Sequence, residues 1–287
     1  MSRPKILIQL DTDRQPSLFD SIVAVDAGVD NLLRYQGVTS HNVVELVHGA
    51  IFTRSPDDLW RTAIFVGGSD VGTAEAVLDQ IRDTFFGPLR VSVMVDPGGS
   101  NTTAAAAVLA ATKHVRLAGA TVVVLAATGP VGQRVVRLLA REGAIVRACS
   151  RSLDRAKAVC ESVESKVPGA NLTAHSIRSS DEVQSALAGA TVVIAAGAAG
   201  VELMSLENRL HCPSLEVAID LNAVPPAGIA GVEVIDKATD RGGIKSYGAI
   251  GVGGTKMKIH KSALQLLFET NDRILDAEEL FELGRGV

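Results

Sequence analysis

The sequence predicts an α/β protein of two domains, each built on a mainly parallel sheet. Segments typical of buried strands alternate with segments typical of helices along almost the whole chain, which is the pattern of parallel strands joined by crossover helices. The chain has 287 residues, and a domain averages about 150 residues. Hydrophobic residues make up 47% of the chain and aromatic residues only 3%. The cores are therefore expected to consist of Ala, Val, Leu and Ile, which suit buried parallel strands.

The first hundred or so residues alternate between short apolar runs and amphipathic segments. Gly28 and the Gly87-Pro88 pair follow two of the expected helices, because glycine and proline end helices. The expected strands are residues 6–10, 63–66 and 91–95, and the expected helices are residues 17–27, 40–50, 69–86 and 102–117.

A second alternating series starts at residue 121, after the long Ala-rich helix, and indicates a separate domain. The expected strands are residues 121–126, 145–149, 171–175, 191–195 and 216–220, and the expected helices are residues 130–142, 153–166 and 181–188. Two more helices are expected at residues 256–270 and 276–283, where the chain can return to the first domain.

Charge, cysteine content and hydropathy exclude several classes of protein. The formal net charge is −4 at pH 7, which argues against a nucleic-acid or anionic-membrane partner but leaves room for a small anion at a local basic cluster. The longest apolar runs fall short of the roughly 18 residues that span a bilayer, and the short run near the N-terminus is expected to be a strand and not a signal peptide. The three cysteines are scattered, so neither a disulfide framework nor a metal site is expected. We expect a cytoplasmic protein without a metal.

The most informative motif is the glycine turn that follows the strand at residues 121–126. A strand that runs into a glycine turn and then a helix is the context of a dinucleotide-binding loop. Gly129 lets the backbone approach a pyrophosphate, Gly132 lets the helix pack against the strand, and Pro130 stands where a missing N–H costs nothing. Ala127 replaces the usual first glycine. The expected contacts of this loop are Thr128, Gly129, Pro130, Val131 and Gly132.

The end of the next strand indicates which dinucleotide is bound. An NAD site usually has Asp or Glu there to accept hydrogen bonds from the ribose 2′-hydroxyl. This chain has Ser150, Arg151 and Ser152, followed by Arg155. Hydroxyl and guanidinium groups suit a 2′-phosphate, so NADP is the predicted cofactor, with NAD left open as a secondary one.

Three later positions are also expected to lie at the cofactor. Ala196 belongs to a small-residue loop that follows a strand, and Asn222 follows the last strand of the second domain, where its amide can face the nicotinamide carboxamide. Gly253 lies in a Gly-rich loop that leads into a basic helix start at Lys256. A lysine at a helix N-terminus is unfavourable for the helix dipole, so its place there suggests an anionic or electron-rich ligand.

Polar residues at the start of the 102–117 helix are candidates for binding a substrate. Ser100, Asn101, Thr102 and Thr103 are consecutive, and capping a helix needs only one of them. Asp13 and Asp20 follow the first strand, where clefts of open sheets form; their alternative role is capping and solvation of a loop.

Taken together, the motifs resemble the NADP-dependent methylene-tetrahydromethanopterin and methylene-tetrahydrofolate dehydrogenases of C1-metabolising bacteria. The match follows the family's order over essentially the full chain. The matching runs are FVGG (65–68), GSNTTAAA (99–106), TGPVG (128–132), NAVPPAGIAG (222–231) and GAIGVGG (248–254).

The resemblance implies a Rossmann-type NADP-binding domain, residues 106–264, inserted between the parts of an α/β substrate domain, residues 1–105 and 265–287. It also implies a pterin bound in the cleft between the domains, and a homo-oligomer, either a trimer or a hexamer. Thr102, Thr103 and Lys256 match positions at the pterin ring, and Asp13 and Asp20 lie in a matching stretch.

The implied reaction oxidises the methylene carbon of the pterin to a methenyl group by hydride transfer to NADP. No proton moves in that step, so the expected role of Lys256 and of the two threonines is to align the pterin rather than to act as a base. The sequence leaves tetrahydromethanopterin and tetrahydrofolate both open. A shikimate dehydrogenase-like enzyme is a weaker alternative, because its proton transfer needs a Lys–Asp pair and the first domain has only Lys5 before Lys113. A non-catalytic NADP-binding sensor is the alternative outside enzymes.

Overall fold

The chain forms two structural units, each with its own sheet, in a computed structural model that describes residues 3–287. The first unit comprises the residues up to Thr102 together with Met257–Val287, and the second comprises Thr103–Lys256. Both boundaries fall inside helices, α4 (Ser100–Thr112) and α9 (Ala249–Leu266). The sequence placed them at 105/106 and 264/265, and an uninterrupted helix carries no break in pattern that would locate them more closely.

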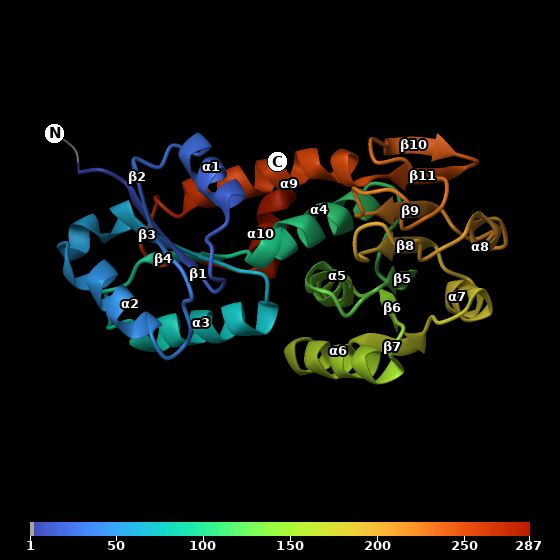
Figure 1. Ribbon diagram of the computed structural model, residues 1–287, viewed down its shortest axis with the longest axis horizontal. Helices are drawn as coiled ribbons and strands as arrows, with labels where there is room; N and C mark the ends of the chain where they lie inside the picture. The colour runs from blue at the N-terminus through green and yellow to red at the C-terminus, as the bar shows by residue number, and fades with distance from the viewer. Residues whose placement is uncertain (1–2) are drawn as a thin grey trace. The chain divides into compact units, whose positions relative to one another are not determined.

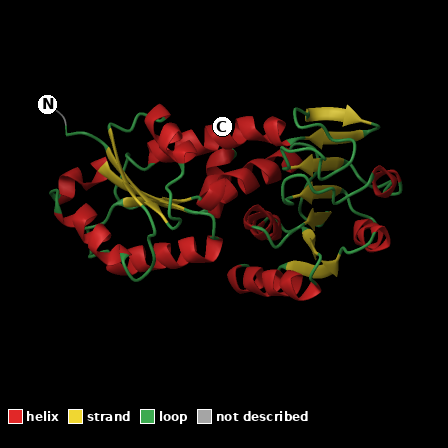
Figure 2. Cartoon of the chain, viewed as in Figure 1, coloured by secondary structure: helices red, strands yellow, loops and turns green. Residues whose placement is uncertain are grey.

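A five-stranded parallel sheet forms the centre of the first unit (Figures 1 and 2). Its strands, in spatial order, are β12 (Ile274–Leu275), β4 (Ser92–Val95), β3 (Thr62–Gly67), β1 (Ile6–Asp11) and β2 (Asn31–Tyr35). From β1 the chain goes to β2 on one side and then to β3 on the other. The strand order therefore reverses between β1 and β3, and ligands of open α/β sheets bind at such a switch point.

Helices cover both faces of this sheet. Alternate strand residues, among them Ile8, Ile64 and Val93, form a buried cluster with apolar side chains of α2 (Val43–Phe52) and α3 (Val71–Thr84). On the other face, Gln9 of β1 accepts a hydrogen bond from Ser21 of α1 (Leu18–Asp26), 2.9 Å between oxygens. The C-terminal part of α9 also lies on this face, where the ring of His260 stacks on Phe65. The last helix is α10 (Ala277–Gly284).

The second unit has a seven-stranded sheet that is parallel except for one edge hairpin. The spatial order is β10 (Lys237–Arg241), β11 (Ile244–Tyr247), β9 (Val217–Asp220), β8 (Val192–Ala195), β5 (Thr121–Leu125), β6 (Ile145–Ser150) and β7 (Asn171–Ser176). The chain passes from β5 to β6 and β7 and then crosses to β8 on the other side of β5. This is the Rossmann arrangement, with its switch point between β5 and β8.

Helices cover both faces of the central strands in the second unit, as Figure 1 shows. The helices α5 (Pro130–Arg141) and α6 (Leu153–Lys166) lie on one side, and α7 (Ser180–Leu187) and α8 (Leu206–Leu210) lie on the other. The central strands are almost entirely buried, and β5 and β8 carry only Val, Leu, Ile and Ala at their buried positions. Such continuous apolar runs are expected where helices cover both faces.

The predicted α/β fold with a Rossmann-type unit is confirmed, and several elements differ from the expectation. The structure adds β2, β12 and the β10–β11 hairpin, none of which the sequence pattern indicated. The strand β2 is a largely exposed edge strand, and β12 has only two residues. Neither element carries the buried apolar run by which the other strands were found.

The expected start of the penultimate helix was wrong. Residues 248–254 were expected to form a Gly-rich loop, but α9 begins at Ala249, and Gly251, Gly253 and Gly254 are helical. At Gly251 the reason is space. A Cβ there would lie 1.8 Å from the carbonyl oxygen of Asp236, so glycine lets the helix approach the backbone that precedes β10.

Among residues 3–287, no helix is long and apolar enough to cross a membrane. The same residues contain no cluster of His, Cys, Asp and Glu that would hold a metal ion.

We predict that Gly251→Ala destabilises the protein by about 2–4 kcal/mol, because the new methyl group must displace backbone atoms. Gly254 is the matched control, since it lies in the same helix with nothing within 4 Å of its Cβ position. Gly254→Ala should stabilise the protein by about 0.5–1 kcal/mol through the better helix propensity of alanine. Urea unfolding followed by circular dichroism measures both changes. Equal effects of the two substitutions would contradict this account of Gly251.

Candidate functional site: the β5–α5 turn and the adjoining strand ends

The turn between β5 and α5 brings a helix N-terminus unusually close to the strand that precedes it. A Cβ on Gly132 would lie 2.6 Å from the carbonyl oxygen of Ala126 and 2.8 Å from the Cα of Ala127. Gly129 is the N-cap residue and has no side-chain cap, and Pro130 occupies the first turn. The amide groups and the positive end of the helix dipole are thus presented to an anion, as in dinucleotide-binding loops.

The tight turn itself depends on Ala126 and not on the position where the motif usually has its first glycine. Ala126 has φ of 57°, in the left-handed region that residues with a Cβ rarely adopt. Ala127, which stands at the glycine position of the motif, is fully buried, and its N–H donates to the carbonyl oxygen of Cys149 on β6, 2.8 Å away. An alanine therefore fits at position 127, because the left-handed conformation falls one residue earlier.

The switch point gathers the loops that follow β5, β8 and β9. The Cβ position of Gly129 lies 3.7 Å from the carbonyl oxygen of Ala196, and that of Gly200 lies 3.5 Å from the carbonyl oxygen of Pro225. Thr128 is half-buried on the first of these loops. Residues that the sequence separates by almost a hundred positions are thus brought to one edge of one sheet, which is where dinucleotides bind in this fold.

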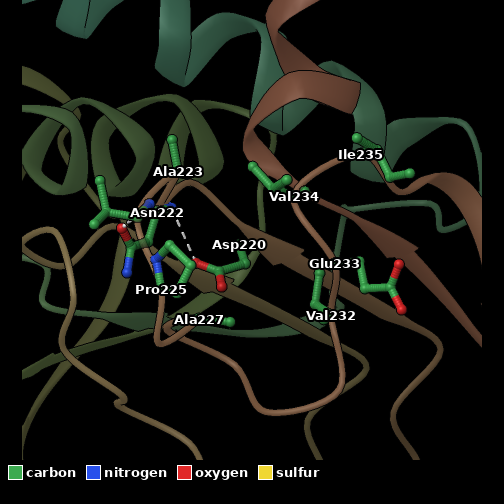
Figure 3. A pocket seen from close by; sticks show the side chains of 11 residues that line it. Asp220, Asn222, Ala223, Pro225, Ala227, Val232, Glu233, Val234 and Ile235 are labelled. Atoms are coloured by element: carbon green, nitrogen blue, oxygen red, sulfur yellow. Dashed lines mark hydrogen bonds between the residues drawn. The ribbon is translucent and has the colours of Figure 1, made fainter.

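The loop after β9 is held by two buried polar side chains, shown in Figure 3. The Asp220 carboxylate accepts hydrogen bonds from the backbone N–H groups of Asn222 and Ile229, at 3.0 and 3.1 Å. The Asn222 amide donates to the carbonyl oxygen of Pro226 and accepts from the N–H of Val224. Both ends of the Asn222 amide are therefore engaged inside the loop. Burial raises the pKa of the Asp220 carboxyl above its ordinary value, although the backbone hydrogen bonds act in the opposite direction.

A mainly apolar cavity of about 440 Å³ adjoins this loop (Figure 3). Asp220 and the 222–227 segment line one side, and residues 232–235 and Gly248 line the other. A volume in this range, with few polar groups, is typical of a site for part of a small organic ligand.

The strand β6 ends in the predicted basic segment. Ser150 is buried and its hydroxyl accepts from the N–H of Ser152, while the Ser152 hydroxyl caps α6 by accepting from the N–H of Arg155. Arg151 and Arg155 are exposed. The structure thus places two hydroxyls and two guanidinium groups at the carboxyl end of β6, without an acidic side chain at the strand end.

The helix α9 carries the two remaining predicted residues of the second unit, Gly253 and Lys256, both half-buried. Lys256 is not at a helix N-terminus as expected, because α9 begins seven residues earlier. The field of the helix dipole therefore does not act on Lys256, since it is confined to the first turn.

In the first unit, the polar start of α4 forms a buried hydrogen-bond network around Asp96. The Asp96 carboxylate accepts from the Thr102 hydroxyl at 2.6 Å and from the backbone N–H groups of Asn101 and Thr102. The Asn101 amide donates to the carbonyl oxygen of Val95 and to the Asp276 carboxylate. Of the four consecutive polar residues, Ser100, Asn101 and Thr102 are buried, and Thr103 in the second unit is half-buried.

The predicted acidic residues lie near the switch point of the first sheet. Asp13 follows β1 and accepts from the hydroxyl of Ser69, which follows β3, at 2.9 Å. Asp20 is buried in the first turn of α1, where its N–H donates to the Ser17 hydroxyl. Asp13 therefore lies where ligands of open α/β sheets bind, whereas Asp20 stands within a capped helix start.

Sequence reasoning missed the buried carboxylates of Asp96, Asp220 and Asp276. Asp96 directly follows β4, and Asp220 is the last residue of β9. Each precedes a turn rich in glycine or proline, which is a usable signal for a loop held by backbone N–H donors. Asp276 is remote in sequence from Asn101, and only the folded chain shows their contact.

Comparison with known proteins agrees with this geometry. Residues 18–97 match the model of the N-terminal part of methylene-tetrahydromethanopterin dehydrogenases, and residues 126–271 match a model of NAD(P)H-binding domains. Two curated relatives come from Methylorubrum extorquens. The bifunctional protein MdtA is 43% identical over 98% of each chain, and an NAD(P)-dependent methylenetetrahydromethanopterin dehydrogenase is 32% identical over 97% of each chain. The chain belongs to the methylenetetrahydromethanopterin dehydrogenase family.

Solved structures of other dehydrogenases share the fold of this family member. The 5-ketofructose reductase of Gluconobacter and the quinate dehydrogenase of Corynebacterium glutamicum each cover 99% of the chain, with TM-scores of 0.56 and 14% identity. At this identity the likeness extends to the fold alone. The family that the sequence motifs indicated is confirmed.

We predict that Ala126→Gly stabilises this dehydrogenase family member, by up to about 1 kcal/mol. The left-handed conformation destabilises a residue with a Cβ by about 1–2 kcal/mol, and glycine avoids this cost. The larger backbone entropy that glycine loses on folding offsets only part of this stabilisation. Ala127→Gly, one residue later, is the control and should destabilise the protein, because it removes a buried methyl group. Thermal unfolding measures the two changes, and a loss of stability in both variants would contradict the role given to Ala126.

Proposed function

We propose that the protein catalyses the reversible oxidation of methylene-tetrahydromethanopterin to the methenyl form with NADP. The observation that supports this most strongly is the family match over almost the whole chain, in which both the pterin dehydrogenase segment and the NAD(P)H-binding segment are present. Tetrahydrofolate carries the same kind of methylene group, and the turnover experiment below separates the two carriers.

The second unit has the features that a bound dinucleotide requires. Because Gly132 has no Cβ, helix α5 can approach the backbone at Ala126 and Ala127 closely. The N-terminus of α5 has no side-chain cap and suits a pyrophosphate. We infer that Thr128 to Gly132 and Ala196 contact the cofactor. Asn222 shapes the adjoining loop through its two internal hydrogen bonds, and Gly253 lies on the nearby α9.

NADP is favoured over NAD by the residues at the end of β6. Ser150, Arg151, Ser152 and Arg155 offer hydroxyl and guanidinium donors, which a 2′-phosphate accepts. Each charge-assisted hydrogen bond contributes about 1.5–3 kcal/mol, so one or two of them produce a clear preference.

The reaction requires the protein to position the pterin and the cofactor, but not to transfer a proton. The methylene carbon of the pterin lies between two nitrogens, whose lone pairs expel a hydride and leave a delocalised methenyl cation. When bound, NADP supplies the acceptor of that hydride. We propose that Lys256 and Thr103 align the pterin, and that Thr102 supports them from the buried network around Asp96. Such alignment contributes up to about 7–11 kcal/mol to lowering a barrier.

We further propose that the protein is a cytoplasmic homo-oligomer, either a trimer or a hexamer. An apolar stripe on α1 supports self-association. Leu18, Ile22 and Val25 follow the spacing of one helix face and are 66%, 54% and 62% exposed. Exposed apolar stripes of this kind mark protein–protein contacts.

The direct test is the initial rate of nicotinamide reduction, measured with the methylene forms of tetrahydromethanopterin and tetrahydrofolate, each with NADP and with NAD. We expect the fastest turnover with methylene-tetrahydromethanopterin and NADP, since the family and the basic end of β6 favour that pair. Tight NADPH binding without turnover of either carrier would contradict the proposal and would favour a cofactor-binding sensor.

The role of Lys256 is tested by Lys256→Ala. We expect this substitution to lower kcat/KM for the pterin at least tenfold, because the loss of one aligning contact costs more than about 1.4 kcal/mol. The NADPH dissociation constant should stay within about twofold of the wild-type value. Lys258→Ala is the matched control, because Lys258 lies two residues further along α9 and is exposed. Steady-state kinetics and fluorescence titration measure the two quantities. Full activity of Lys256→Ala would remove Lys256 from the site.

A further inference from the structure

A second arginine stands beside Arg151 at the edge of the Rossmann sheet. The strands β6 and β7 are paired in register, with Ser150 opposite Ser176. The pairing continues one step beyond the strands, since the N–H of Ile177 donates to the carbonyl oxygen of Ser150 at 3.0 Å. The chains therefore leave the sheet side by side, and Arg151 and Arg178 follow directly.

Arg178 is fixed in this position by its own side chain and by its backbone. Its Nε donates to the carbonyl oxygen of Arg151 at 2.9 Å. Its backbone N–H donates to the Glu182 carboxylate, which also accepts from the Ser176 hydroxyl. These hydrogen bonds, led by that of the Arg178 backbone, lower the pKa of the Glu182 carboxyl. The bond through Nε holds the guanidinium beside Arg151 and leaves its terminal nitrogens as donors for another group.

Within residues 3–287, neither Arg151 nor Arg178 forms a salt bridge with a carboxylate. The charge of Arg178 is among the causes that lower the pKa of the Glu182 carboxyl, so this carboxylate compensates part of that charge. Like charges that line one cavity repel each other, and an anion bound by both reduces that repulsion. The Glu182 carboxylate accepts hydrogen bonds from the Arg178 backbone and from the Ser176 hydroxyl, and thereby stabilises the loop that follows β7.

Both arginines line a cavity of about 310 Å³ at the carboxyl ends of β6, β7 and β8. Apolar side chains of Ile177, Val201 and Leu203 form part of its wall. The charged side chains of the lining are the two arginines and Glu202, so the cavity carries a net positive charge. A site with an apolar wall and paired guanidinium groups suits a flat heterocycle that carries a phosphate.

We propose that Arg178 is a specificity-determining residue that binds the 2′-phosphate of NADP together with Arg151. The inference rests on the proposed cofactor site and extends it to a residue on another strand. A phosphate monoester carries about −1.5 to −2 charges at pH 7, and two guanidinium groups match its oxygens better than one. NAD lacks this phosphate, so Arg178 strengthens the binding of NADP and not that of NAD.

The test is the binding of four ligands to the full-length protein, measured by isothermal titration calorimetry without a pterin. The ligands are NADPH, NADH, 2′,5′-ADP and 5′-AMP. We expect Arg178→Gln to weaken NADPH and 2′,5′-ADP about 10- to 100-fold, as loss of a charge-assisted hydrogen bond does, and to leave NADH and 5′-AMP within about twofold. Arg178→Lys, which keeps the charge, should recover part of the loss.

Lys237→Gln is the matched control, because it removes the same charge from an exposed residue of β10, at the opposite edge of the same sheet. It should leave all four affinities unchanged. Unchanged NADPH binding in Arg178→Gln would overturn the inference. Equal weakening of 2′,5′-ADP and 5′-AMP would also overturn it, because Arg178 would then only hold the loop in shape. Failure of the wild-type protein to bind NADPH would instead refute the proposed cofactor site, and the inference with it.

Discussion

The close approach of helix α5 to strand β5 is the constraint on which the nucleotide-binding unit depends. It requires that position 132 carry no Cβ, because the nearest backbone atoms lie within 3 Å of where that atom would be. It also requires a left-handed residue at the end of the strand, which Ala126 supplies at some cost in energy. As a result, the N-terminus of α5 lies against the loop after β8 at the switch point of the sheet, and that loop lies against the loop after β9. The cofactor is proposed to bind there.

The same physical device holds a loop in each unit. Asp96 and Asp220 both stand at the end of a buried strand, and each carboxylate accepts backbone N–H groups of the turn that follows. A buried carboxylate satisfied in this way is costly to disturb, so it fixes the turn more firmly than a solvated side chain would. Thr102 and Asn222 are attached to turns that these carboxylates hold in place, which favours catalysis by alignment.

The fold by itself does not determine the substrate. A 5-ketofructose reductase and a quinate dehydrogenase share it at 14% identity, so the substrate has to be inferred from the groups at the strand ends. Hydroxyl and guanidinium groups follow β6, a further arginine follows β7, and Lys256 lies on α9. Because the methylene-to-methenyl oxidation moves a hydride and no proton, these groups can serve entirely as binding and aligning groups.

The sequence alone determined the α/β class, the positions of the buried strands along the chain and the glycine turn expected to bind a dinucleotide. These features are local: a buried strand shows as an apolar run, and Gly129, Pro130 and Gly132 are consecutive or nearly so. Only the tertiary structure showed that Asn101 and Thr102 are committed to Asp96 and Asp276, that Gly251 lies inside a helix, and that Arg178 stands beside Arg151. The Asn101–Asp276 contact, the close approach of Gly251 to Asp236 and the position of Arg178 beside Arg151 depend on strand register or on packing between separate segments, and no local pattern of residues encodes such a contact.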